Sequence, residues 1–335
     1  MWLSAHVNNL IFSGCWNEDF KAKIKNFFGM EDLGSVKYAL GIRITQYAEG
    51  ISMIQDKVIQ QIWSEFTLEN AQPLTSPLPS SINDLKSHHL EPCQHPPFHY
   101  QRAIRLLQYL VQGACPNLTH SKILGMKELT LQLGQNNLQH DLNTIIGFSN
   151  AYWGGSKECK SFSSSLIYYQ GAIGWCSHKQ KVVALSSAGV EYNALTECSQ
   201  DLLWLKQLLY KISTIECSGT LFSNNQSAIA ITSNQIYHHG TRHINFGLHF
   251  IRDLIEKSEI QLKYLPTTNM VADSLTKNFP IQKSKITSRQ CLEAKQRSLG
   301  MVVYWEKTLL GPCTNCHDAP QQTFQVQLLK ITRLH

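Results

Sequence analysis

The chain has 335 residues, enough for two domains, and its 43% hydrophobic and 16% charged residues are typical of a globular protein rather than a disordered one. The formal net charge of +6 favours an anionic partner such as nucleic acid. No apolar run reaches the roughly 18 residues of a membrane span. The N-terminal residues carry no basic segment, so the sequence predicts neither a membrane anchor nor a secretory signal.

Ten cysteines are scattered along a chain that is long enough to fold without disulfide staples, which predicts free thiols in a reducing compartment. The expected location is therefore intracellular, cytoplasmic or nuclear, and not secreted. Cys313 and Cys316, followed by His317, have the spacing of covalent haem attachment. No helical haem-binding context surrounds them, and no second Cys or His pair completes a zinc site, so we interpret the spacing as chance.

The first part of the chain alternates helical and extended patterns. The expected elements are a helix at 18–28, strands at 35–47 and 50–55, a helix at 56–68 that begins at the N-cap Asp56, and a short helix at 100–112. Between the last two, residues 72–98 are rich in Pro, Ser, His and Asn, which predicts a linker. No clear periodicity follows until about residue 143.

From residue 143 the patterns are sharper. The expected strands cover 143–149, 163–170, 172–178, 219–223 and 260–265, with a tight turn at Gln170 and Gly171. A long helix is expected to begin near Ser187. Its apolar residues, spaced by three and four, predict one buried stripe that consists of Leu195, Cys198, Leu202, Leu205, Leu209 and Ile212. Further helices are expected at 225–233, 243–258 and 268–277. Three antiparallel strands followed by βαβ crossovers predict a mixed sheet with helices on its faces.

Four sequence segments carry a family resemblance: ALSSAGVEYNALTECSQDLLWLKQLL, NNQSAIAI, TRHINFGLHFIRDLIE and VADSLTK. They resemble the ribonuclease H domain of copia-type retrotransposon polyproteins. The N-terminal stretch, from HVNNLIF to MEDLGSVKYALGIRI, looks like the end of the reverse transcriptase palm of the same polyprotein. The segment QRAIRLLQYLVQGACPNLTHS resembles the connection that follows that palm.

The resemblance implies an α/β fold class: a ribonuclease-H-like mixed five-stranded sheet with flanking helices, preceded by a truncated α+β reverse transcriptase palm and connection segment. The expected divisions are a palm remnant at 1–78, a linker and shortened connection at 79–140, the ribonuclease-H-like domain at 143–280, and a poorly ordered tail at 281–335.

Ribonuclease H enzymes hydrolyse the RNA strand of an RNA–DNA hybrid with two Mg²⁺ ions, which prefer anionic oxygen ligands. The resemblance implies four carboxylates, at positions 150, 191, 224 and 273. Glu191 and Asp273 are retained, whereas Asn150 and Asn224 stand where Asp is expected, and Tyr152 stands where family members usually carry another Asp. Asparagine keeps a carbonyl ligand but loses the charge, so we expect a weakened Mg²⁺ site and severely reduced catalysis.

The polymerase motif is altered in the same way. Polymerases of this kind carry an Asp pair in a hairpin, and Asn8 and Asn9 stand at those two positions. The resemblance also implies that the upstream palm is missing, so this segment is expected not to polymerise DNA. Asp-to-Asn is a single G-to-A transition. The four asparagines therefore suggest a hypothesis of decay by cytosine deamination, which does not explain Tyr152.

Restoring Asp at positions 8, 9, 150, 152 and 224 would lower the formal charge from +6 to +1, so much of the basic excess reflects missing acids. Lys179, Lys181 and Arg242 remain as candidates for sequence-independent phosphate contacts, and a solvated hairpin is the equal alternative. A histidine group, which comprises His238, His239, His243 and His249, lacks an acidic partner at a useful spacing, and we do not expect a metal site there.

The interpretation is a copia-type reverse transcriptase and ribonuclease H sequence whose ancestral activity is Mg²⁺-dependent cleavage of RNA in RNA–DNA hybrids and which is inactive here. Two alternatives remain: a non-cleaving nucleic-acid-binding module, and a weakly active ribonuclease H that works around Glu191 and Asp273. The expected partner is an RNA–DNA hybrid or other nucleic acid bound without sequence preference. We expect no membrane and no small-molecule substrate.

Overall fold

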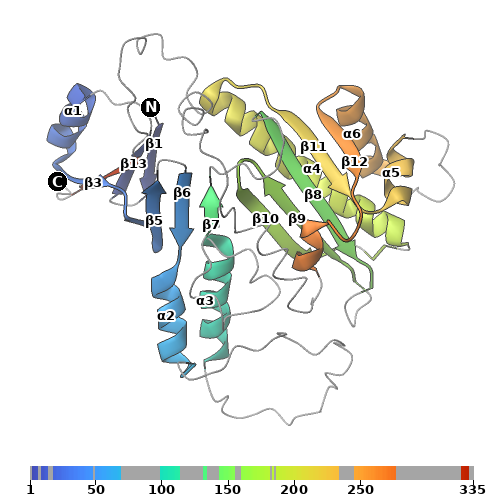
Figure 1. Cartoon of the computed structure of the whole chain (residues 1–335), viewed down its shortest axis with the longest axis horizontal. Coiled ribbons are helices and arrows are strands. Elements are labelled where there is room, and N and C mark those ends of the chain that lie inside the picture. The colour runs from blue at the N-terminus through green and yellow to red at the C-terminus, as the bar shows by residue number, and fades with distance from the viewer. Residues whose placement is uncertain are drawn as a thin grey trace.

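The structure is a computed structural model. It describes residues 2–6, 9–13, 18–47, 50–68, 99–113, 131–133, 143–154, 160–181, 183–184, 186–233, 245–276 and 326–331. Three sheets organise these residues, and the largest lies in the C-terminal half (Figure 1). Among the described helices, none is long and apolar enough to cross a bilayer.

The largest sheet has five strands in the order β10-β9-β8-β11-β12. Its strands are β8 (Thr144–Tyr152), β9 (Phe162–Tyr168), β10 (Ala172–Lys179), β11 (Ser218–Ser223) and β12 (Ile260–Tyr264). Strand β9 is antiparallel to both of its neighbours, whereas β11 runs parallel to β8 and to β12. The five-stranded mixed sheet expected from the sequence is thereby confirmed.

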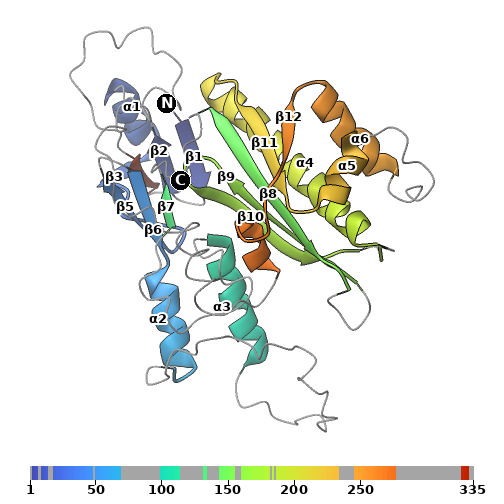
Figure 2. The ribbon, with the colours of Figure 1, turned by 45° about the vertical axis from the view of Figure 1, so that its right-hand side comes forward.

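Helices cover both faces of this sheet (Figure 2). One face carries α4 (Ser187–Ser213), α5 (Gln226–Ser233) and α6 (Asn245–Glu256), and the other carries the short 3-10 helix η4 (Val271–Leu275). The last expected helix, at 268–277, is therefore shorter and tighter than predicted. Neighbouring residues of β8 point to opposite faces of the sheet, because Ile145 packs towards α4 while Ile146 packs towards η4.

Local sequence signals fix the ends of these elements. Ser186 caps α4, because its side chain accepts a hydrogen bond from Gly189 N, and the helix therefore begins where the sequence predicted. The expected turn between β9 and β10 is also present. Gln170 has a φ of 54° and Gly171 a φ of 143°, and Tyr169 N donates to Gly171 O across the turn.

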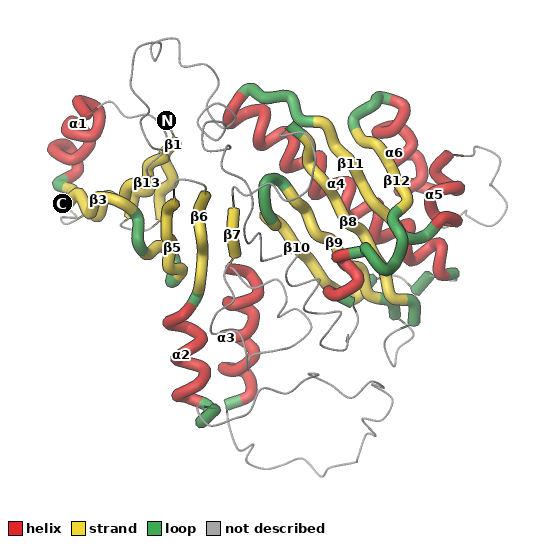
Figure 3. Tube along the Cα trace, viewed as in Figure 1, coloured by secondary structure: helices red, strands yellow, loops and turns green. Residues whose placement is uncertain are grey.

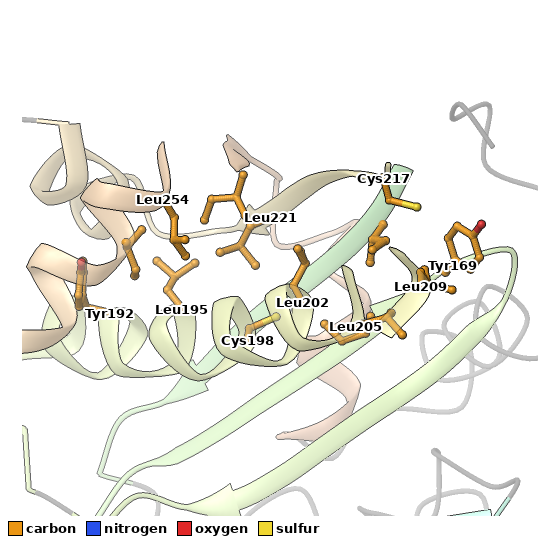
Figure 4. Packing of buried hydrophobic residues seen from close by; sticks show 14 of the residues in the cluster. Tyr169, Tyr192, Leu195, Cys198, Leu202, Leu205, Leu209, Cys217, Leu221 and Leu254 are labelled. Atoms are coloured by element: carbon orange, nitrogen blue, oxygen red, sulfur yellow. The ribbon is translucent and has the colours of Figure 1, made fainter. Parts of the chain in front are cut away.

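The apolar stripe of α4 forms the centre of the main core (Figure 4). Leu195, Cys198 and Leu202 are fully buried, whereas the last predicted member of the stripe, Ile212, is only half-buried. Two glycines let the helix approach the strands closely. A Cβ atom on Gly219 would lie 2.6 Å from Leu202 Cδ2, and one on Gly147 would lie 3.0 Å from Cys198 Sγ.

The two smaller sheets consist mainly of strands from the N-terminal half (Figure 3). The elements are β1 (Trp2–His6), β2 (Asn9–Ser13), α1 (Glu18–Phe28), β3 (Met30–Ser35), β4 (Tyr38–Ala39), β5 (Ile42–Tyr47), β6 (Gly50–Ile54), α2 (Asp56–Glu65), α3 (Tyr100–Gly113) and β7 (Leu131–Leu133). Strands β4 to β7 form one sheet in sequence order. Helices α2 and α3 pack side by side through Ile59, Ile62 and Leu110.

The single strand predicted at 35–47 is wrong, because the chain turns back within it. Leu40 and Gly41 both have positive φ, 51° and 67°, and β4 pairs antiparallel with β5 across them. The Tyr109 hydroxyl of α3 donates to Leu40 O and so fixes the turn from outside. A leucine at positive φ gives no turn signal in the sequence, which explains the error.

One strand lies inside the predicted tail. Residues Val326–Ile331 form β13, which pairs antiparallel with β2 on one side and with β3 on the other, in the sheet order β1-β2-β13-β3. This corrects the expectation of a poorly ordered tail for these six residues. The run VQLLKI is rich in strand-forming residues, and pairing on both edges satisfies its backbone donors and acceptors.

The two halves of the chain share a core. Leu131 of β7 is buried in one cluster with Ile146 of β8 and Leu166 of β9, and half-buried Met53 of β6 packs against it. Trp175 of β10 adds a polar link, because its Nε1 donates to Val111 O of α3 over 2.7 Å. Strand β7, which no pattern in the sequence predicted, contributes Leu131 to the shared cluster. The predicted division points remain predictions.

The close approach at Gly219 predicts a stability effect. Gly219→Ala should lower the free energy of unfolding by about 1–3 kcal/mol, because the new methyl group overlaps Leu202 in a packed core. Gly174→Ala is the matched control, since its Cβ would meet Ile167 at an ordinary 3.6 Å. Urea denaturation followed by circular dichroism measures both. Equal stability of the two variants would contradict the packing argument.

Candidate functional site

Asn150 stands at the end of the central strand β8 and is completely buried. Its Nδ2 donates two hydrogen bonds of 2.9 Å, one to Asp273 Oδ1 and one to Thr276 Oγ1. A carboxylate only accepts hydrogen bonds, so the amide nitrogen must be the atom that faces Asp273. Both donors of the Asn150 amide are thereby used within the protein.

Asn224 reaches the same point from the neighbouring strand. The parallel pairing of β11 with β8 sets Phe222 opposite Phe148, so Asn224 comes level with Asn150. Its Nδ2 lies 3.3 Å from Asn150 Oδ1 and 3.3 Å from Thr267 Oγ1. The structure thus brings three of the four predicted ribonuclease H positions, 150, 224 and 273, into one hydrogen-bonded network.

Glu191 lies at the same end of the sheet. The preceding residue, Val190, is packed in a buried cluster with Ala151, which follows Asn150 on β8, and with Ala184. The first turns of α4 therefore lie beside the end of β8. The Glu191 side chain is 8% exposed, and Asp273 is 1% exposed. The two retained carboxylates are both buried at this end of the domain.

Sequence reasoning missed the hydroxyl groups that hold η4 against the sheet. Ser164 Oγ lies 2.9 Å from Ala272 O and 3.3 Å from Asn150 O, so β9 ties η4 to β8. Ser177 Oγ of β10 donates to Leu275 O over 2.7 Å. The serine run at 163–165, unusual inside a buried strand, was the available signal. Thr267 and Thr276 left no signal that would separate them from other loop threonines.

The network is a poor fit for a pair of Mg²⁺ ions. Mg²⁺ needs oxygen ligands, yet the side chain of Asn150 turns an N–H group towards Asp273 Oδ1. An N–H group occupies the carboxylate oxygen and repels a cation. Among the described residues, no group of three or more His, Cys, Asp and Glu side chains is placed to hold a metal ion. At position 150 the group that faces Asp273 is a hydrogen-bond donor and not a metal ligand.

The other predicted residues that the structure describes are not among the hydrogen-bonded members of the network. Lys179 ends β10 and is half-buried, and Lys181 is exposed two residues further. Asn9 begins β2 opposite His6 and Lys330. Tyr152 is 39% exposed at the end of β8. Several further residues lie outside the described residues: Asn8, Arg242, His238, His239, His243, Cys313, Cys316 and His317. His249 is exposed on α6.

The strand order defines the class of this domain. A five-stranded sheet in the order β10-β9-β8-β11-β12, with only β9 antiparallel to the rest and polar residues at the ends of β8 and β11, is the ribonuclease-H-like arrangement. An RNase H1 isolated from compost matches with a TM-score of 0.32 and 15% identity, over 43% of this chain and 99% of that one.

Sequence comparison covers the N-terminal part of the chain as well. Residues 4–80 match the family of reverse transcriptases (RNA-dependent DNA polymerases). The Pol polyprotein of transposon TNT 1-94 from Nicotiana tabacum is 25% identical over 302 residues, which cover 79% of this chain and 22% of that protein. The Pol polyprotein of transposon RE1 from Arabidopsis thaliana is 26% identical over 274 residues, covering 75% of this chain and 18% of that protein.

The chain is similar over most of its length to retrotransposon Pol polyproteins, and a segment that matches reverse transcriptases, residues 4–80, precedes its ribonuclease-H-like domain. It spans about a fifth of the length of these two curated relatives. The resemblance noted from the sequence is confirmed at this level.

The hydrogen bond between Asn150 and Asp273 predicts the effect of restoring the acid. Without divalent cations, Asn150→Asp should lower the free energy of unfolding by about 3 kcal/mol or more, because two buried carboxylates would then face each other. Asn193→Asp is the matched control, since Asn193 Nδ2 donates to the neutral Gln180 Oε1 over 3.4 Å. Urea denaturation in EDTA measures both variants. Equal losses would contradict the expectation.

Proposed function

We propose that the ribonuclease-H-like domain of this chain is a catalytically inactive form of an Mg²⁺-dependent hydrolase of RNA–DNA hybrids. The observation that carries the proposal is the hydrogen bond from Asn150 Nδ2 to Asp273 Oδ1. In an active site of this kind, two ions activate the attacking water and stabilise the leaving oxygen. Here an amide holds one of the two retained carboxylates inside the protein.

Charge supports the same conclusion. Two adjacent divalent cations repel each other strongly in a site of low dielectric constant, and carboxylates offset that repulsion. Asn150 and Asn224 supply neutral amides at two of the four positions, which leaves Glu191 and Asp273 as the only carboxylates of the predicted set. The weakly active alternative requires these two carboxylates to hold the metal alone.

The reverse transcriptase segment follows the same pattern. Strands β1 and β2 are adjacent and antiparallel, with His6 opposite Asn9. A polymerase of this type needs carboxylates at the hairpin to bind Mg²⁺ for phosphoryl transfer, and the residues at these two positions are Asn8 and Asn9. We propose that this segment has no polymerase activity.

Non-specific binding of nucleic acid is the second candidate function, and a basic and aromatic surface favours it. Trp153 is 56% exposed. Ser161 connects Gly154, the residue after Trp153, to the segment that carries Lys181. The links are hydrogen bonds from Gly154 N to Ser161 Oγ, 3.1 Å, and from Gln180 N to Ser161 O, 2.7 Å. Lysines contact phosphates, and exposed aromatic rings stack on bases, without reading sequence.

Restoring both acids tests the inactive-hydrolase proposal. The unmodified chain should not cleave an RNA–DNA hybrid in Mg²⁺ or Mn²⁺. The double variant Asn150→Asp, Asn224→Asp should gain cleavage of about 100-fold or more over background, since electrostatic groups of this kind are each worth that much in rate. A labelled hybrid on a denaturing gel measures cleavage. Adding Glu191→Gln should abolish the gain. Robust cleavage by the unmodified chain, lost in Glu191→Gln, would overturn the proposal.

Salt-dependent binding tests the second function. The double variant Lys179→Ala, Lys181→Ala should reduce the slope of log affinity against log salt concentration by about 1 to 2, as expected when one or two phosphate contacts are lost. Fluorescence anisotropy of a labelled hybrid between 50 and 200 mM salt, a range of about fourfold, measures the slope. Lys257→Ala, which removes an exposed lysine of the α6 end, is the control. No binding at low salt would remove the binding function.

A further inference from the structure

A relay of three side chains lies between β10 and α4, away from the asparagine network. Cys176 Sγ lies 3.3 Å from His178 Nδ1, and His178 Nε2 lies 3.2 Å from Glu197 Oε1. The strand pattern explains the arrangement. Residues 176 and 178 share the face of β10 that is turned to α4, whereas Trp175 and Ser177 make their hydrogen bonds on the opposite face, to α3 and η4.

All three residues of the relay are partly exposed. Cys176 is exposed, and the side chains of His178 and Glu197 are 43% and 41% exposed. The two other cysteines that the structure describes, Cys198 and Cys217, are buried. Among the described residues, Cys176 is therefore the thiol that a solute can reach.

The hydrogen bonds also set the proton positions. The Glu197 carboxylate only accepts, so His178 Nε2 carries the proton of the neutral ring and donates it to Oε1. The lone pair is then on Nδ1, where it faces the Cys176 thiol. A nucleophile within reach of a base, with the base oriented by a third group, is the arrangement that activates cysteine nucleophiles.

We propose that Cys176 is a thiol modification site that reacts with low-molecular-weight disulfides, with His178 as general base and Glu197 as the residue that orients it. The Cys176 proton moves to His178 Nδ1 while the sulfur electron pair attacks one sulfur of the disulfide. The S–S bond of the reagent breaks, and its other sulfur leaves as a thiolate, which takes the proton back from the imidazolium. The products are a mixed disulfide on Cys176 and one free thiol.

The electrostatic surroundings make the base necessary. The titratable groups that act on the thiol are His178 on its own strand and Asp201 and Glu197 on α4. Partial burial of its sulfur raises the pKa of the Cys176 thiol, and the negative charges of Asp201 and Glu197 raise that pKa further. A free thiolate is therefore scarce at neutral pH, so the reaction needs a base beside the thiol to take its proton. Exchange through the histidine is the favoured route.

The test follows glutathionylation of the full chain by glutathione disulfide, with peptide mass spectrometry to assign each modified cysteine. At pH 7, Cys176 should react in the native chain while Cys198 should not, and Cys176→Ser should remove the signal. His178→Gln should slow modification of Cys176 by about tenfold or more, and Glu197→Gln should slow it less. Asp253→Asn is the control and should leave the rate unchanged. It removes an exposed carboxylate of α6 that forms an ion pair with Lys257.

A pH profile separates a base from a structural role. At about pH 10 and above, hydroxide removes the thiol proton, so the rates of wild type and His178→Gln should converge. A constant ratio at all pH values would overturn the assignment of His178, and equal rates at pH 7 would overturn the relay. Modification of Cys176 only after unfolding would overturn the site itself. If His178→Gln does not fold, Glu197→Gln carries the same comparison.

Discussion

The close contact between α4 and the strands beneath it is the constraint on which the C-terminal half depends. Gly147 and Gly219 remove the side chains that would keep the helix away, and Leu202 fills the space above them. That depth of packing positions Val190 against Ala151 and so sets the start of α4 beside the end of β8. The geometry of the asparagine network and of the Cys176 relay depends on this packing, because Glu191 and Glu197 both belong to α4.

The asparagine network joins the ends of β8 and β11 to η4 by hydrogen bonds between neutral and charged groups. Carboxylates that converge in a buried place repel one another until a cation arrives, and the apo state of such a site carries unfavourable energy. In this chain the converging groups are complementary instead: Asn150 donates to Asp273 and accepts from Asn224. Two threonine hydroxyls complete the network, so the strand ends are held without any ion. The amide and hydroxyl groups thereby attach η4 to the end of the sheet.

Much of the fold follows from patterns that are local in the sequence. Burial of the stripe from Leu195 to Leu209 is predictable because the helical spacing of these residues places them on one apolar face. The positions of Asn150, Asn224 and Asp273 were also predictable, since the family resemblance names them. What could not be predicted depends on partners distant in sequence. Ser164 becomes an anchor for η4 only because of the strand register, and the relay needs β10 and α4 to meet. Likewise, β7 is a strand because of its neighbour β6.

Strand β13 has a consequence for the order of folding. Gln327 pairs with Phe12, although nearly the whole described chain lies between them. Contacts so distant in sequence form late, because the entropy of closing the intervening loop opposes them until other parts are compact. During synthesis the facing edges of β2 and β3 stay open until residues 326–331 have left the ribosome. The ribonuclease-H-like sheet, whose strands all come earlier, can close first and serve as the template against which the N-terminal half is completed.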